Sequence, residues 1–205
     1  MRLPRHVDQP EPALRMLLET PRLRLGALHN DDAATLYAYR GSPAVSRYQG
    51  WRPSSVDQAR EFIARQAGAS LDIPDSWSQF AIRLRTDGCL IGDLGVYMPE
   101  DGDGSVEFGI SIAPDFQAQR YAAEVLRALF KQLFVQRGMR RIHASVDPRN
   151  LASMTMLRSV GMRQEAHHLE SLRLHGEWVD DVVFALLARE WLAMQSGHPS
   201  GAVSR

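Results

Sequence analysis

The sequence predicts a domain of the α/β or α+β class, because segments with the period of strands alternate with segments with the period of helices. Residues 106–112 alternate apolar and polar side chains as a strand does, and residues 122–133 carry apolar side chains at three- and four-residue spacing as a helix does. Asp87-Gly88 stands between two further alternating segments, which is a strong hairpin signal. With 205 residues, 44% of them apolar, the chain supplies one hydrophobic core and has no room for a second catalytic domain.

The same patterns place the elements along the chain. Strands are predicted at about residues 17–28, 78–86, 90–98, 106–112 and 141–146. The cap signals at Asn30 and Ser54 predict helices over about residues 31–39 and 54–67, and two further helices follow the strands that end at 112 and 146. Residues 41–53 and 68–78 are then exposed or lid-like connections, and residues 100–104 form a second tight turn.

The ends of the chain are expected to carry no chemistry. Residues 1–14 contain three prolines and residues 193–205 are mostly small and polar, so we predict two flexible segments around a single domain at 15–192. The first ten residues lack the apolar core of a signal peptide, and no apolar run reaches the roughly 20 residues that span a bilayer. The sequence therefore predicts a cytoplasmic protein with no membrane partner.

Charge and composition exclude other functions. Lys and Arg number 24, as do Asp and Glu, so there is no overall basic field to bind nucleic acid. Cys89 is the only cysteine, which excludes an internal disulfide, and the seven histidines have no spacing typical of a metal site.

The junction between the strand at 106–112 and the following helix can hold a phosphate. Pro114 ends the strand, and the N–H groups of the first helical turn lack intrahelical partners and carry the positive end of the helix dipole. Taken alone, this segment is better interpreted as an ordinary strand-turn-helix unit of an α/β domain.

Three further motifs support a functional interpretation. Asp147-Pro-Arg-Asn-Leu-Ala-Ser153 follows the strand at 141–146 and leads into a helix that ends at Gly161. The first predicted strand contains Leu18-Glu-Thr-Pro-Arg-Leu-Arg-Leu25, and the last predicted hairpin contains Asp180 to Leu187. Together with the strand-turn-helix unit, and in their order along the chain, these motifs resemble the GNAT superfamily of N-acetyltransferases, and most closely its branch of ribosomal-protein N-terminal (alanine/serine) acetyltransferases. The resemblance covers roughly Leu17 to Trp191.

This resemblance implies a fold and a cofactor. The fold is a mixed, strongly twisted sheet of about seven strands with helices on both faces, in the order β-α-α-β-β-β-α-β-α-β-β. The cofactor is acetyl-CoA, with CoA as product. Its diphosphate should lie at the loop Gln117-Ala118-Gln119-Arg120-Tyr121-Ala122. The family has a glycine where this chain has Arg120, so the side chain either crowds the phosphates or points outward and adds positive charge near them. We favour a working site.

Further cofactor contacts are implied by the resemblance. The pantetheine arm should pair with the backbone of Ile110, Ser111 and Ile112, whose main chain can also bond the thioester carbonyl. Asn150 matches an asparagine that contacts the pantetheine region, although it could equally serve as a helix cap.

Acetyl transfer also needs a base, because an alkyl ammonium with a pKa of about 10 is protonated at neutral pH. Glu107, on the strand beside the cofactor, is the first candidate, with pairing to a neighbouring Arg as the alternative. Glu170 is the second candidate, or else it lines the acceptor pocket. Leu157 stands where many members have a tyrosine acid, which leaves Ser153 to protonate the departing thiolate, unless it is merely a polar residue of the first helical turn.

The acceptor site should be formed by loop aromatic residues. Tyr48, Trp51 and Trp77 are the expected substrate-binding residues, together with Glu170, although the tryptophans could instead pack against the core. Trp178 lies in the last hairpin and is a further candidate.

These observations predict an acetyl-CoA-dependent N-acetyltransferase that acts by direct attack of a primary amine in a ternary complex. The acceptor is a protein N-terminus, or alternatively a small amine or an aminoglycoside. A non-catalytic CoA-binding or interaction module is the remaining alternative. We expect a monomer or homodimer.

Overall fold

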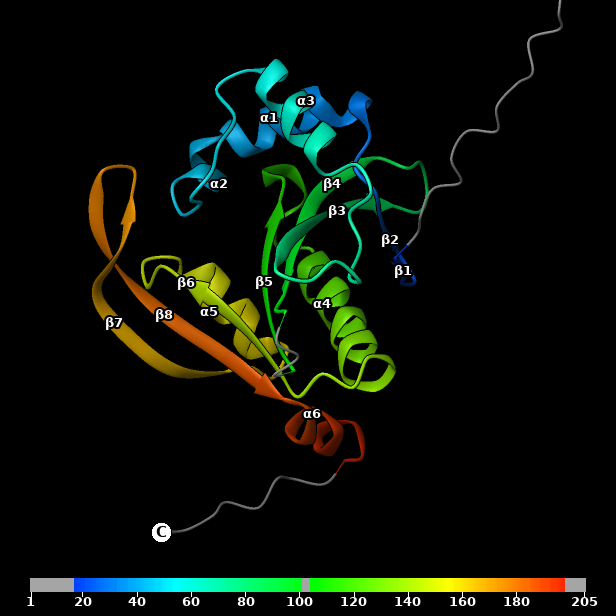
Figure 1. The fold of residues 1–205 in the computed structure, drawn as a ribbon, viewed down its shortest axis with the longest axis vertical. Coiled ribbons are helices and arrows are strands. Elements are labelled where there is room, and N and C mark those ends of the chain that lie inside the picture. The colour runs from blue at the N-terminus through cyan, green and yellow to red at the C-terminus, as the bar shows by residue number, and fades with distance from the viewer. Residues whose placement is uncertain (1–16, 101–103, 198–205) are drawn as a thin grey trace, which may run out of the picture.

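The computed structural model describes residues 17–100 and 104–197 (Figure 1). The predicted N-terminal segment at 1–14 lies outside the described residues, as do 101–103 of the second turn and 198–205 of the C-terminal segment. No helix within the described part of the chain has the length and apolar character needed to cross a membrane.

The centre of the fold is an eight-stranded sheet in the order β1-β2-β3-β4-β5-β6-β8-β7. Neighbouring strands are antiparallel except for β5 and β6, which are parallel. The strands are β1 (Leu18–Glu19), β2 (Leu23–Gly26), β3 (Ser76–Leu84), β4 (Leu90–Met98), β5 (Ser105–Ile112), β6 (Arg141–Val146), β7 (Arg163–Leu174) and β8 (Glu177–Leu187).

The sheet has one strand more than the expected seven, because the segment predicted as one strand at 17–28 contains a tight turn. The backbone N–H of Thr20 bonds the Leu23 carbonyl at 2.9 Å, and the Thr20 hydroxyl accepts from the Leu23 N–H at 2.9 Å. These bonds reverse the chain at Pro21 and Arg22, so β1 and β2 pair with each other.

Helices cover both faces of the sheet, as expected. They are α1 (Ala33–Gly41), α2 (Pro43–Ser46), α3 (Val56–Arg65), α4 (Tyr121–Lys131), α5 (Leu151–Ser159) and α6 (Ala188–Gln195). Side chains along β3 alternate between two cores: Phe80 and Ile82 pack in the one that contains residues of α4 and α5, and Ala81 packs with α1 and α3. The short α2 and the terminal α6 were not predicted.

The feature that creates a site is the separation of β5 from β6 (Figure 1). These strands pair only where residues 105–107 face residues 141–143. Beyond Glu107, β5 continues alongside β4 as far as Ile112, whereas β6 continues alongside β8 as far as Val146. One edge of residues 108–112 therefore keeps backbone N–H and C=O groups that no neighbouring strand pairs.

Candidate active site

A cleft of about 790 Å³ lies along this unpaired edge. The end of β5, the loop before α4 and the first turns of α5 form its walls, and residues of α2 and the segment after it cover it. Ten of the eleven residues expected to bind the cofactor line it: Ile110, Ser111, Ile112, Gln117, Ala118, Arg120, Tyr121, Ala122, Asn150 and Ser153. The eleventh, Gln119, belongs to the same loop, but its side-chain amide bonds the Asp115 carbonyl at 3.2 Å.

The loop before α4 has the backbone shape that a glycine would normally supply. Arg120 is the N-cap of α4 and adopts the left-handed conformation, with φ 64° and ψ 14°, and Ala118 also has a positive φ of 58°. The first bond of the helix runs from the Glu124 N–H to the Arg120 carbonyl at 3.1 Å. The preceding N–H groups of the first turn therefore have no partner within the helix and can bind an anion. The Arg120 side chain is exposed at the cleft.

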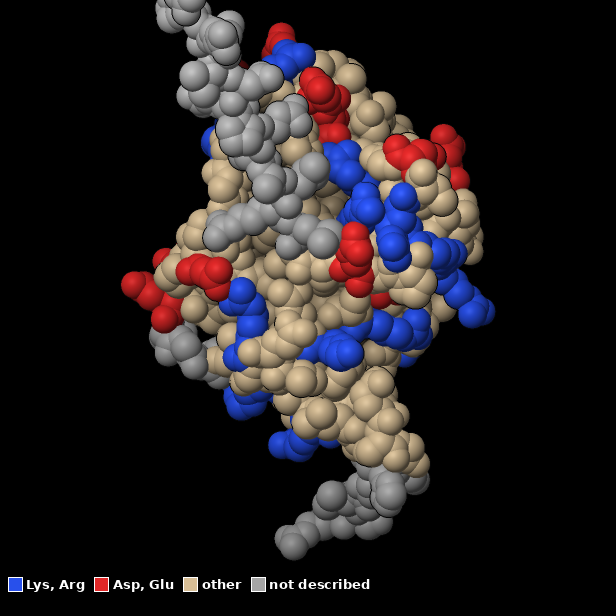
Figure 2. Space-filling view, turned by 90° about the vertical axis from the view of Figure 1, so that its right-hand side faces the viewer, with Lys and Arg blue, Asp and Glu red and all other residues tan. Residues whose placement is uncertain are grey.

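A second arginine braces this loop from the turn between β1 and β2. The Arg22 guanidinium bonds the Glu124 carboxylate at 2.7 Å and the Gln119 carbonyl at 3.2 Å, and lies 4.4 Å from the centre of the Tyr121 ring. Figure 2 shows Lys and Arg side chains gathered in a band across the face that carries β1, β2 and α4. This side of the molecule therefore suits a phosphorylated ligand, although the net charge of the chain is zero.

A smaller cavity of about 120 Å³ occupies the gap between β5 and β6. Six residues line both spaces and mark the junction where they meet: Tyr48, Gln49, Ile110, Asn150, Ser153 and Met156. The structure thus brings together the expected residues Tyr48, Asn150 and Ser153. Asn150 does cap α5, because its side-chain oxygen accepts from the Ser153 N–H at 3.1 Å. Its amide nitrogen has no hydrogen-bond partner among the residues that the structure describes.

Two contacts hold the cover of this junction in place. The Tyr48 hydroxyl donates to the Arg149 carbonyl at 3.2 Å, which ties the segment after α2 to the loop before α5. His175, at the tip of the β7–β8 hairpin, contacts the Ser46 carbonyl through Nε2 at 3.0 Å. Three segments far apart in sequence therefore meet over the junction.

Glu107 is the last residue of β5 that pairs with β6, opposite His143. Burial, and then the neighbouring Asp181 carboxylate, raises the pKa of its carboxyl. Among the described residues, the basic side chain within ion-pair distance of its carboxylate is His143, whose Nε2 lies 3.8 Å away, rather than the arginine considered as an alternative. Glu107 lines neither cavity, but Gly109, two residues farther along the strand and about 7 Å away, lines the smaller one.

The remaining acceptor candidates lie away from the junction. Glu170 is exposed on β7 with φ 45°, and its backbone N–H bonds Asp180 at 2.9 Å. Trp51 stacks on Phe62, with the ring centres 4.3 Å apart, and packs against the core under α1 and α3. Trp51 therefore packs against the core, which was the alternative to substrate binding.

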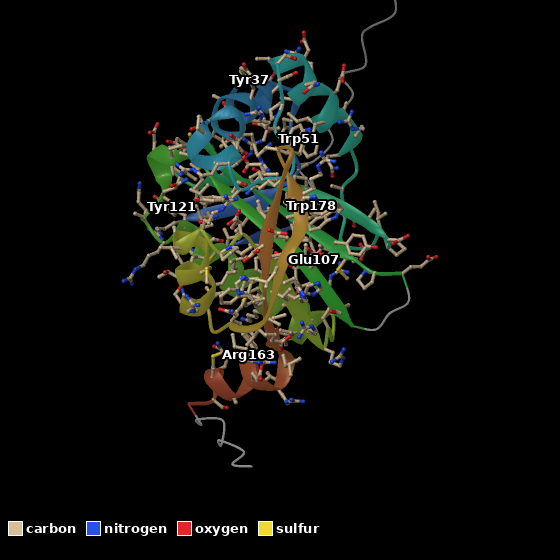
Figure 3. The ribbon with its side chains drawn as sticks, turned by 90° about the vertical axis from the view of Figure 1, so that its left-hand side faces the viewer. Tyr37, Trp51, Glu107, Tyr121, Arg163 and Trp178 are labelled. Carbon is tan, nitrogen blue, oxygen red and sulfur yellow. The ribbon has the colours of Figure 1, made fainter. Side chains whose placement is uncertain are left out.

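The two other tryptophans named from the sequence, Trp77 and Trp178, are exposed. Trp77 is 45% exposed, and the strand register places it opposite Tyr97, which in turn lies opposite Glu107. Trp178 is 62% exposed on β8. Figure 3 shows Trp51, Trp178 and Glu107 on one side of the molecule, with Tyr121 at its margin.

Gln49, His143 and Asp181 were not singled out from the sequence. His143 stands between two apolar residues of a strand and Asp181 follows another aspartate, and neither has a local signal of function. Gln49 could not be identified because its place depends on how the segment after α2 folds back over the cleft.

The Acetyltransferase (GNAT) domain model matches residues 22–163, well over half of the chain. The chain belongs to the GNAT family of acetyltransferases. It is 27% identical over 176 residues to the uncharacterized N-acetyltransferase YnaD of Bacillus subtilis, a match that covers 86% of this chain and 99% of that protein. As a member of this GNAT family it is an N-acetyltransferase, and the family uses acetyl-CoA as co-substrate.

Solved structures share the fold of this GNAT domain. The ribosomal-protein-S5-alanine acetyltransferase of Vibrio fischeri superposes with a TM-score of 0.70 at 16% identity, over 85% of this chain and 97% of that one. A chimera of the spermidine N-acetyltransferase SpeG from Vibrio cholerae and hSSAT superposes with a TM-score of 0.69 at 22% identity, over 83% and 98%.

The residues present fit a CoA thioester. The edge of β5 that no strand pairs offers donors and acceptors to the two amides of a pantetheine arm, although the Ile112 carbonyl accepts from the Gln117 side chain at 2.8 Å. The α4 N-terminus lies at the same cleft. Ile110, Ile112 and Met156 supply apolar walls for the methylene groups.

Proposed function

We propose that this enzyme transfers an acetyl group from acetyl-CoA to a primary amine by direct attack in a ternary complex. The observation that carries the proposal is the meeting of two spaces at one junction. A long cleft with an anion-binding end suits the donor, and a separate opening between β5 and β6 suits the acceptor. Both substrates can then be bound at once, which a direct transfer requires.

In this proposal backbone groups and two polar side chains bind the acetyl donor. The first-turn N–H groups of α4 and the Arg120 side chain bind the diphosphate, and the edge at Ile110–Ile112 pairs with pantetheine. The amide nitrogen of Asn150 supports the same arm, since its oxygen is used by the helix cap.

Glu107 accepts the proton that the amine must lose. Its raised pKa makes the carboxylate a stronger base, and because Glu107 lines neither cavity we assign it a relay through water rather than direct contact. Ser153 is at the junction and donates a proton to the departing thiolate. A thiol with a pKa near 8.5 is already a fair leaving group, so the base matters more than the acid.

We propose a protein N-terminus as the acceptor. The sequence motifs of the ribosomal-protein branch support this choice, as does the pair of exposed Trp77 and half-buried Tyr97 beside Glu107, which offers an aromatic surface to a peptide. The fold likeness to a spermidine N-acetyltransferase chimera favours a small amine as the second candidate, and Trp77 and Glu170 would then line its path.

Two measurements test the proposal. Isothermal titration with acetyl-CoA should give saturable binding, and absence of binding at millimolar cofactor would favour the interaction module instead. Release of CoA thiol is then followed with peptides that begin with Ala or Ser, with spermidine and with kanamycin. We expect the peptides to be acetylated fastest. If only spermidine or kanamycin is acetylated, the acceptor is a small amine and not a protein N-terminus.

A further inference from the structure

Gln49 is placed where the two substrates would react. It lies in the segment after α2 and is one of the residues shared by the donor cleft and the smaller cavity. Of the polar side chains at this junction, Asn150 caps α5 with its oxygen and Tyr48 donates its hydroxyl to a carbonyl. The contacts of Gln49 decide what it can offer there.

A buried ion pair fixes the direction of the Gln49 amide. Asp93 on β4 is fully buried and bonds the Arg40 guanidinium, as well as the Tyr39 hydroxyl at 2.6 Å. Arg40 in turn donates from Nη1 to Gln49 Oε1 at 3.0 Å. A guanidinium carries only donors, so the oxygen of Gln49 must face Arg40. Its amide nitrogen must therefore point away from the ion pair.

The charge of Arg40 strengthens this donor. A cation bonded to the amide oxygen polarises the group and makes its N–H a better hydrogen-bond donor. Arg40 is itself held between Asp93 and the ring of Trp51, whose centre is 5.9 Å away, so the amide is oriented before any ligand arrives. A donor held in advance toward a developing charge is what stabilises an oxyanion.

We propose that the Gln49 side-chain N–H donates to the acyl carbonyl oxygen of the thioester and stabilises the negative charge that this oxygen gains when the amine attacks. The inference rests on the proposed function. A donor at this junction serves an oxygen rather than the amine, because the attacking nitrogen must keep its lone pair free. The acyl carbonyl is the oxygen that is present whichever acceptor is used.

Two variants separate donation to the thioester from the second role of Gln49, which is to accept a hydrogen bond from Arg40. Gln49→Glu keeps an oxygen for Arg40 but replaces the N–H donor by an acceptor, whereas Gln49→Met removes both. We expect each variant to lower the turnover number by about tenfold or more, equally for every amine accepted. Thermal stability should fall in Gln49→Met alone, because only that variant leaves the Arg40 Nη1 group without its acceptor.

Binding of the donor provides a readout without an acceptor. Titrations with acetyl-CoA and with CoA should show that wild type prefers acetyl-CoA, and that Gln49→Glu loses this preference while its affinity for CoA stays within about twofold. Wild-type turnover in Gln49→Glu, or an unchanged preference, would overturn the inference and leave the proposed function intact. Failure of wild type to bind either compound would overturn both.

Discussion

At the scale of the residue, Arg120 keeps the left-handed backbone conformation that suits glycine, although its side chain differs from the glycine of the family motif. Its left-handed conformation costs a non-glycine residue roughly 1 kcal/mol, and the structure nevertheless retains it at the start of α4. The exposed guanidinium replaces the open space of a glycine by a positive charge at the anion-binding end of the cleft.

We predict that Arg120→Gly binds acetyl-CoA about three- to tenfold more weakly at low salt, because a charge near the diphosphate is lost. The difference should shrink as salt rises and screens that charge. Thermal stability should stay the same or increase, since glycine adopts this conformation without strain. Arg120→Lys is the matched control, and tighter binding by Arg120→Gly would mean that the side chain crowds the phosphates.

Glu107 gives a prediction on stability as well as rate. Its pKa is raised in the folded protein above the ordinary 4.5, mainly by burial, so ionised Glu107 destabilises the fold. This cost is absent below the unfolded pKa and develops as pH rises through the folded one. Glu107→Gln should therefore melt higher than wild type at neutral pH, with the gain lost near about pH 4.

The same variant should be slow in catalysis. Without a base, the rate depends on the scarce neutral amine, so Glu107→Gln should lose most activity at the acidic side of the pH profile. Profiles of CoA release for both proteins test this, and superimposable shapes would remove Glu107 from the role of base.

At the scale of the element, the turn between β1 and β2 holds the anion-binding loop through Arg22. We predict that Arg22→Ala weakens acetyl-CoA binding by a few fold and lowers stability by less than about 1 kcal/mol, because the pair with Glu124 is partly exposed. Arg24→Ala is the matched control: Arg24 on β2 makes a comparable exposed pair with Glu19 on β1, away from the anion-binding loop. Equal effects of the two substitutions on affinity would contradict a bracing role.

Elements were more predictable than their arrangement. The period of apolar residues identified β3 to β6 and α4 within a few positions, because each carries a buried face that must repeat along it. The turn at Pro21 was missed, since the bonds of Thr20 that create it lie inside a segment with the strand pattern.

The site followed the same division. Residues on motifs, such as Ser153 and the loop before α4, were found from the sequence and line the cleft. The separation of β5 and β6 could be expected only by resemblance, because no local pattern tells where pairing between strands about 30 residues apart stops. Gln49 was out of reach for a similar reason, as its orientation is set by Asp93, 44 positions away.

At the scale of the whole molecule, the pair of Arg40 and Asp93 joins the helical layer to the sheet. Arg40 belongs to α1 and Asp93 to β4, and their side chains are 9% and 0% exposed. Gln79 on β3 also bonds Asp93, and the Arg40 side chain continues the network to Gln49. One buried charge pair therefore connects the fold to the junction of the two cavities.

Breaking this pair should destabilise the protein strongly. We predict that Arg40→Leu lowers the free energy of unfolding by about 3–5 kcal/mol, because it leaves a carboxylate buried without a counter-charge. The double variant Arg40→Leu with Asp93→Leu should recover much of that loss, since no unpaired charge remains. Urea denaturation of the four proteins in this cycle measures the coupling. If the losses simply add, the carboxylate is satisfied by Tyr39 and Gln79, and Arg40 serves the orientation of Gln49 rather than the stability of the fold.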